Sequence, residues 1–77
     1  MTMNKNLNIR NSRMKNRLKE ARFKKGKSQI QLFKETGIWP SKISYIENGY
    51  WNPSEEEKKK LAKALGIEKG WLFSKNE

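Results

Sequence analysis

Residues 29–49, QIQLFKETGIWPSKISYIENG, decide the fold, because two short helical patterns meet there at Gly37. In the second pattern Ile43 and Ile46 lie three positions apart, so at about 100° of rotation per residue both point to one side of a helix. Glycine tolerates the left-handed backbone that a tight corner requires. We therefore expect a helix over about 40–48 that meets the preceding helix at a tight corner and turns its two isoleucines toward a core.

The residues at the ends of both patterns are types that start and stop helices. Pro40 suits a first helical position, because its φ is already helical and its missing N–H needs no partner there. Gly49 suits the left-handed stop. Upstream, Ser28 can cap a helix over 29–35 whose Leu32 points inward. These capping and stop residues therefore predict where both helices begin and end.

An earlier helix is expected to carry an apolar stripe and one arginine. Ser12 can cap it, and it ends near Gly26. Its buried stripe consists of Met14, Leu18, Ala21 and Arg22. In the later pattern, Glu47 lies only about 40° around the helix from Ile43. We expect Arg22 and Glu47, opposite charges at the edge of the core, to form an ion pair, with two independent solvated charges as the alternative.

The segment after residue 50 predicts two more helices. Ser54 and Glu57 have the spacing of a capping box, and Gly66 stops the helix that they start. The packing face of that helix is formed by Leu61, Ala62 and Leu65. A short final helix brings Trp71, Leu72 and Phe73 onto the core or toward a second subunit. The sequence thus predicts an all-α fold of five helices around one hydrophobic cluster.

Composition limits the class of protein. A chain of 77 residues makes one small domain. It has no Cys and no His, so disulfides and thiolate metal sites are excluded, and we expect neither a metal nor a cofactor. Enzyme activity is disfavoured, because the only acidic cluster, 55–57, is explained by helix capping. The start, MTMNKNLNIRNSR, lacks the apolar run of a signal peptide, and no membrane-length apolar stretch follows, so we expect a cytoplasmic protein.

The positive charge is concentrated in the first half of the chain. Residues 1–42 hold 12 Lys or Arg against 2 Glu, which gives 12 − 2 = +10, whereas residues 43–77 hold 6 of each sign. Residues 1–11 are rich in Asn and Lys without periodicity, and we expect them to form a flexible basic arm. A positive face that binds a polyanion is the favoured interpretation, and a solvated lysine-rich surface is the alternative.

The spacing of several residues resembles that of phage Cro and repressor proteins. The matching positions are Gln29, Leu32, Gly37, Ile38, Ile43, Ser44, Ile46, Glu47 and Gly49. The flanks agree, with Leu18 and Arg22 before the motif and the run from Leu61 to Ile67 after it. The chain is therefore similar over about 12–73 to the lambda repressor-like, XRE-type domain. This resemblance implies a compact five-helix domain over 12–75, a helix-turn-helix at helices 2 and 3, and the same arginine–glutamate ion pair.

The resemblance also implies a function. It predicts a sequence-specific, double-stranded DNA-binding transcriptional regulator, a repressor, whose helix at about 40–48 reads the major groove. The residues that it assigns to DNA contact are Gln29, Trp39, Pro40, Ser41, Lys42, Ser44, Tyr45, Asn48 and Asn52. Among them, Ser41 and Tyr45 can hydrogen-bond base edges, Pro40 offers only apolar contact, and Gln29 corresponds to a phosphate-binding position.

Two aromatic residues depart from the family pattern. Phe33 stands where the family has a small residue, so the helix corner must widen unless the ring tilts outward. Trp39 stands where the family has a serine-like cap. Its ring either presses on a sugar or methyl group of DNA or forms a lid on the core, and both interpretations stay open.

Other functions remain as alternatives. The same fold could serve as an antitoxin or anti-repressor that binds a protein, an idea motivated by Trp51, Trp71 and Phe73 near the less basic end. A cationic binder of single strands is least favoured, because the aromatic residues do not recur at a stacking interval. The expected partner is double-stranded DNA. A homodimer, at least on DNA, and a protein partner are compatible with the sequence, and no membrane association is expected.

Overall fold

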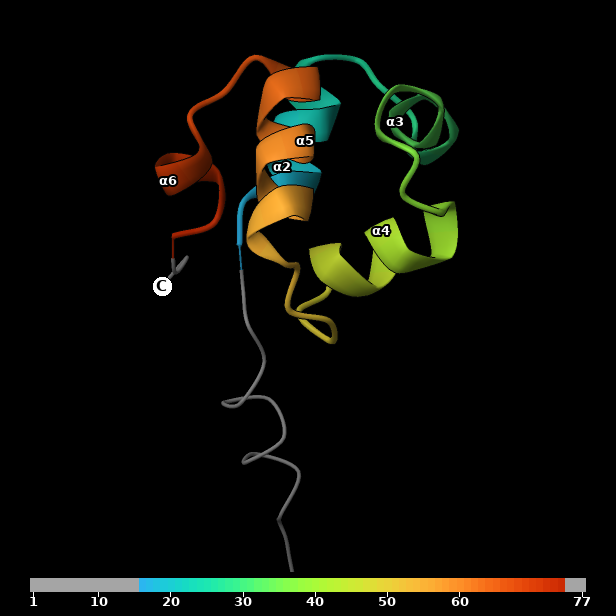
Figure 1. The fold of residues 1–77 in the computed structure, drawn as a ribbon. Helices are drawn as coiled ribbons and strands as arrows, with labels where there is room; N and C mark the ends of the chain where they lie inside the picture. The colour runs from blue at the N-terminus through green and yellow to red at the C-terminus, as the bar shows by residue number, and fades with distance from the viewer. Residues whose placement is uncertain (1–15, 75–77) are drawn as a thin grey trace, which may run out of the picture.

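Five helices make up the part of the protein that the computed structural model describes, residues 16–74, and no strand occurs in that range. They are α2 (Leu18–Lys24), α3 (Gln29–Thr36), α4 (Pro40–Glu47), α5 (Glu55–Leu65) and α6 (Lys69–Leu72). In Figure 1, α5 occupies the middle of the molecule, with α6 on one side and the α3–α4 corner on the other. The all-α class is confirmed. The expected arm over 1–11, the cap at Ser12 and the stripe residue Met14 lie outside the described residues.

All five helices contribute apolar side chains to one core. Its buried members are Leu18, Ala21, Leu32, Ile38, Ile43, Ile46, Leu61, Ala62, Leu65 and Leu72. Phe33, Ala64, Ile67 and Phe73 pack against this cluster and remain partly exposed. Because α3, α4 and α5 each place their apolar positions in the same cluster, the core fixes the orientation of α4 against the rest of the domain.

The corner between α3 and α4 forms as the local signals indicate. The Ser28 hydroxyl accepts a hydrogen bond from the backbone N–H of Gln31 at 3.0 Å and so caps α3. Gly37 follows the helix with φ 80°, and its N–H donates to the carbonyl of Phe33 at 2.7 Å. Thr36, whose hydroxyl donates to the carbonyl of Leu32 at 2.7 Å, extends α3 one residue beyond the expected end.

The start and end of α5 also follow their sequence signals. The Ser54 hydroxyl accepts from the N–H of Glu57, and the Glu57 carboxylate accepts from the N–H of Ser54, so both bonds of the capping box are present. Gly66 ends the helix in the left-handed conformation, with φ 66°.

The first described helix, α2, begins later than the sequence predicts. The expectation was a continuous helix from a cap at Ser12, but residues 16 and 17 are not helical. The Asn16 side chain accepts from the N–H of Leu18 at 2.9 Å, and the N–H of Arg17 donates to the carbonyl of Leu72 at 3.0 Å. Asn16 and Arg17 therefore make these hydrogen bonds instead of continuing the helix. The bond from Arg17 to Leu72 joins the start of α2 to α6.

Candidate nucleic-acid interface

Helix α4 has one buried face and one exposed face. Ile43 and Ile46 have no exposed surface, whereas Ser41 is exposed and Tyr45 keeps 55% of its surface exposed. Pro40 occupies the start of the helix, as predicted. Ser41 and Tyr45, which the resemblance assigns to base contacts, therefore lie on the surface, away from the buried isoleucines.

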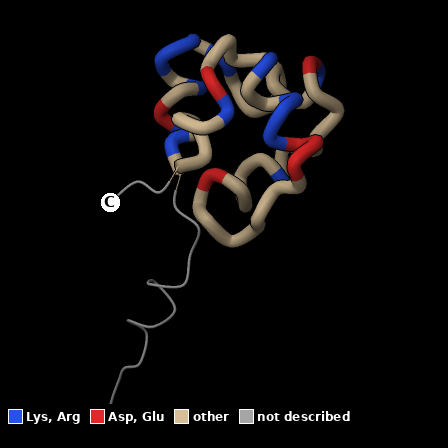
Figure 2. The backbone as a smooth tube through the Cα atoms, turned by 60° about the vertical axis from the view of Figure 1, so that its left-hand side comes forward, with Lys and Arg blue, Asp and Glu red and all other residues tan. Residues whose placement is uncertain are grey.

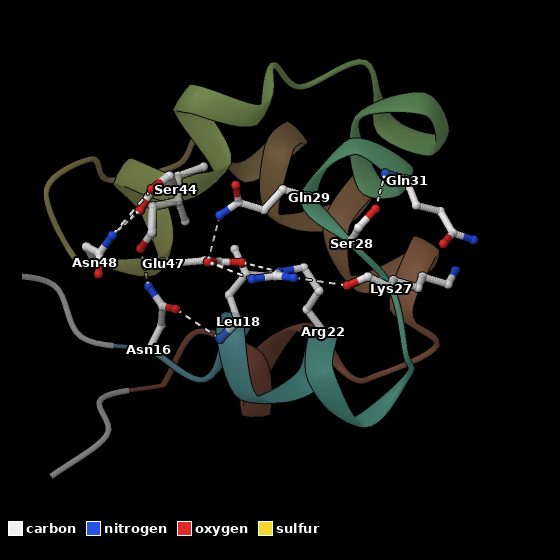
Figure 3. Close-up of polar contacts among 11 residues, drawn as sticks. Asn16, Leu18, Arg22, Lys27, Ser28, Gln29, Gln31, Ser44, Glu47 and Asn48 are labelled. Carbon is white, nitrogen blue, oxygen red and sulfur yellow. Dashed lines mark hydrogen bonds and ion pairs between the residues drawn. The ribbon is translucent and has the colours of Figure 1, made fainter.

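A buried ion pair anchors the end of α4. Arg22 Nε lies 2.6 Å from Glu47 Oε2, and the two side chains are only 9% and 2% exposed. Arg22 Nη2 also donates to Glu47 Oε1 at 3.3 Å. In Figure 3 the guanidinium of Arg22, on α2, faces the carboxylate of Glu47, on α4. The two charged residues that the sequence placed at the edge of the core are thus joined, and they link α2 to α4.

Two more groups complete this charged cluster. The amide of Gln29 donates from Nε2 to Glu47 Oε1 at 3.1 Å, and Arg22 Nη1 donates to the carbonyl of Lys27 at 3.0 Å (Figure 3). The cluster therefore ties the start of α3 to both α2 and α4. Gln29 was assigned to a phosphate contact by the resemblance, and in the structure its amide positions Glu47.

The last turn of α4 is held by two asparagine side chains. Asn16 Nδ2 donates to the carbonyl of Ile46 at 2.8 Å. Asn48 Nδ2 donates to the carbonyl of Ser44 at 2.8 Å and lies 3.5 Å from its hydroxyl (Figure 3). Both carbonyls also accept a backbone N–H, Ser44 from Asn48 at 3.0 Å and Ile46 from Gly49 at 3.1 Å, so the side chains add a second bond to each. Ser44 is partly buried, whereas Asn48 is exposed.

Lys42, the only basic residue of α4, is engaged by another helix. Its ammonium lies 2.5 Å from Glu57 Oε2 and 4.7 Å from the centre of the Trp51 ring. Partial burial raises the pKa of Glu57, but the Lys42 ammonium and the Ser54 backbone N–H outweigh this effect, so the pKa lies below its ordinary value of 4.5. Sequence analysis explained Glu57 by capping alone and therefore missed this pair.

The two aromatic residues that depart from the family pattern contact each other. The rings of Phe33 and Trp39 stack with their centres 4.9 Å apart and their planes 19° from parallel. Phe33 is partly buried, and Trp39 remains 66% exposed just before α4. Trp39 therefore covers Phe33, and most of its surface stays exposed beside the start of α4.

The aromatic residues that motivated the protein-binding alternative make contacts within the chain. Trp51 lies beneath Lys42, and the guanidinium of Arg17 lies 4.7 Å from the centre of the Trp71 ring. Phe73 packs against the core. Each of these three aromatic residues thus has an intramolecular role, although Trp51 and Trp71 keep exposed surface.

The loop that follows α4 carries no charge. Figure 2 shows a continuous uncharged segment between α4 and α5, with acidic residues at both of its ends. Asn52 is exposed within this loop. Among the described residues no cluster of His, Cys, Asp or Glu could hold a metal ion, and no helix in that part of the chain is long and apolar enough to cross a membrane.

Comparison with known proteins agrees with this geometry. A family model described as a helix-turn-helix domain matches residues 16–77, which is most of the chain. A search of curated proteins finds no match. The family match supports the XRE-type resemblance and a role in binding DNA. By its sequence, by the corner at Gly37 and by the exposed face of α4, the chain belongs to the helix-turn-helix domain family.

Proposed function

We propose that the protein is a sequence-specific transcriptional repressor that inserts α4 into the major groove of double-stranded DNA and occludes a promoter. The observation that carries this proposal is the division of α4 into two faces: Ile43 and Ile46 are fully buried while Ser41 and Tyr45 are exposed. A helix that is locked into a core through one face presents the opposite face as a rigid reading surface.

The exposed groups favour a particular kind of readout. Ser41 and Tyr45 offer hydroxyl groups, which can donate to or accept from base edges. Trp39 and Pro40 offer apolar surface, which suits the methyl group of thymine. Because α4 contains no arginine and its one lysine, Lys42, is paired with Glu57, the helix does not present the two-pronged cation that selects guanine. We therefore expect operators in which A·T pairs and DNA shape contribute to recognition.

The remaining assigned residues fit contacts to the DNA backbone. Asn48 and Asn52 are exposed at the end of α4 and in the loop that follows. The Asn52 amide can donate to phosphate oxygens, and the Asn48 amide can do so in exchange for its 3.5 Å contact with the Ser44 hydroxyl. Such contacts set the register of the protein without selecting sequence. The excess of basic residues in the first half of the chain supplies the attraction to phosphate that does not depend on sequence. Two copies of the protein would read half-sites roughly 34–36 Å apart.

Selection from random duplexes at two salt concentrations tests the proposal, because it reports motif, half-site spacing and the electrostatic share of binding together. The reading role of α4 is then tested with Tyr45→Ala. This change should weaken cognate binding by about 1–3 kcal/mol and leave nonspecific binding nearly unchanged. Phe23→Ala is the matched control, because it removes another exposed aromatic ring, from α2. Its ring lies 4.7 Å from the Arg22 guanidinium, so circular dichroism first checks that the variant keeps its helices, and it should then change neither affinity.

Equal losses on cognate and nonspecific DNA would contradict the role of Tyr45 in reading bases. A selection that yields no enriched motif would contradict sequence-specific binding as a whole. A pull-down in the absence of nucleic acid separates the alternative function, a protein-binding antitoxin or anti-repressor, from the proposed one.

A further inference from the structure

Glu57 occupies an unusual position for an acidic residue next to a DNA-reading helix. It is the third residue of α5, and its two carboxylate oxygens have different partners. Oε1 accepts from the backbone N–H of Ser54 at 2.9 Å, and Oε2 pairs with Nζ of Lys42 on α4. The first contact, together with the N–H of Glu57 bound to the Ser54 hydroxyl, fixes the carboxylate in place.

Lys42, the partner of this fixed carboxylate, is the only residue of α4 whose charge could attract phosphate. The segment PSKISYIE contains two charged residues, Lys42 and Glu47. Glu47 is neutralised by Arg22, and Lys42 is neutralised by Glu57 and held over the Trp51 ring. The Lys42 and Glu57 side chains are 32% and 19% exposed, so the pair is partly shielded from solvent and salt. The reading helix therefore carries no uncompensated charge.

We propose that Glu57 is a specificity-determining residue that lowers nonspecific DNA affinity by keeping the Lys42 ammonium away from phosphate. Nonspecific binding comes essentially from lysine and arginine contacts to phosphate, which every sequence offers equally. Sequence reading depends instead on the neutral groups of Ser41 and Tyr45. Restraining the Lys42 ammonium on the reading helix thus lowers nonspecific affinity more than operator affinity, and it raises the ratio of operator affinity to nonspecific affinity.

This inference rests on the proposal that α4 faces DNA, and it is tested on a duplex without an operator. Glu57→Gln removes the charge that holds Lys42, while glutamine can still serve at this position of a capping box. One additional phosphate contact should steepen the dependence of log K on log salt by about 0.9, which corresponds to roughly eightfold tighter nonspecific binding per tenfold reduction in salt. Circular dichroism checks that the variant keeps its helices.

Two controls isolate the role of Lys42. Glu56→Gln makes the same change of net charge at the neighbouring exposed position and should leave the slope close to that of the wild type. In a Lys42→Gln background, Glu57→Gln should no longer steepen the slope, because the released cation is missing. An equal change in the Glu56 and Glu57 variants, or a steeper slope that persists without Lys42, would overturn the inference.

The outcomes for the inference and for the proposed function can be told apart. A selection without an enriched motif, together with a steeper slope for Glu57→Gln, would overturn sequence reading and support only the restraint of the Lys42 ammonium by Glu57. An enriched motif together with an unchanged slope would support the proposed function and overturn the role of Glu57. Absence of binding to any duplex would overturn both.

Discussion

Removing Glu47 should test whether the buried ion pair holds the helix-turn-helix corner together. The side chain is 2% exposed and accepts hydrogen bonds from Arg22 and from the amide of Gln29. In Glu47→Ala the guanidinium of Arg22 stays buried and loses the carboxylate, although it keeps its bond to the carbonyl of Lys27 and its place 4.7 Å from the centre of the Phe23 ring. The stranded charge, more than the lost attraction, then determines the cost.

The expected loss is about 3–5 kcal/mol, the range for breaking a buried pair by removing one partner. A domain of 77 residues has a total free energy of unfolding of about 4–12 kcal/mol, so the variant should be close to unfolding. Urea denaturation followed by circular dichroism measures the change. The melting temperature should fall by at least about 12 °C, because 1 kcal/mol corresponds to about 4–8 °C at this size.

The matched variant replaces both charges with apolar residues of similar volume. In Arg22→Met with Glu47→Leu, no charge remains buried, so the double variant should recover most of the stability that Glu47→Ala loses. A cost below about 1 kcal/mol for Glu47→Ala, the value of an exposed pair, would refute the burial argument. A double variant as unstable as Glu47→Ala would show that the stranded charge is not the cause.

Three further predictions concern the corner, the capping box and the reading surface. Gly37→Ala should cost about 1–2 kcal/mol in urea denaturation, because φ is +80° while a Cβ would meet nothing within 4 Å, so backbone strain is the only penalty. The pKa of Glu57 lies below 4.5 in the folded protein, so its contribution to the free energy of unfolding is present above pH 4.5 and is lost as pH falls through the folded-state pKa. Glu57→Gln should therefore reduce the loss of stability measured by urea denaturation between neutral and acidic pH. An unchanged loss would disprove the effect. Replacing thymine with uracil in a selected operator should weaken binding by about 0.8 kcal/mol where Trp39 covers the thymine methyl group, and Trp39→Ala should abolish that difference. If the wild-type protein and Trp39→Ala lose the same affinity on the uracil operator, the contact is excluded.

The helix boundaries could be predicted because their physics is local. Ser28 and Ser54 cap helices through bonds to residues three positions later, and Gly37 and Gly66 stop helices through their own backbone freedom. None of these contacts depends on the path of the rest of the chain. The late start of α2 could not be predicted in this way, since Arg17 leaves the helical pattern to contact a carbonyl near the opposite end of the domain.

The candidate site was predictable only in part. Helical periodicity was enough to place Glu47 at the edge of the core and to turn Ile43 and Ile46 into it. The pairing of Lys42 with Glu57 depends on how the intervening loop turns, and no periodic pattern reports that path. The bond from Gln29 to Glu47 was missed for a related reason, because a polar residue at the start of a helix was interpreted as a ligand contact. The DNA contacts themselves stay predictions.

The junction between α2 and α6 has a consequence for protein synthesis. The Arg17 guanidinium donates to the carbonyl of Trp71 at 2.9 Å and to the hydroxyl of Ser74 at 2.6 Å, so residues at the two ends of the described region hold each other. A nascent chain cannot make these bonds until the later segment has left the ribosome. Helix α2, the first of the described helices, therefore emerges before these partners exist, and its final docking is delayed until translation of the domain is nearly finished.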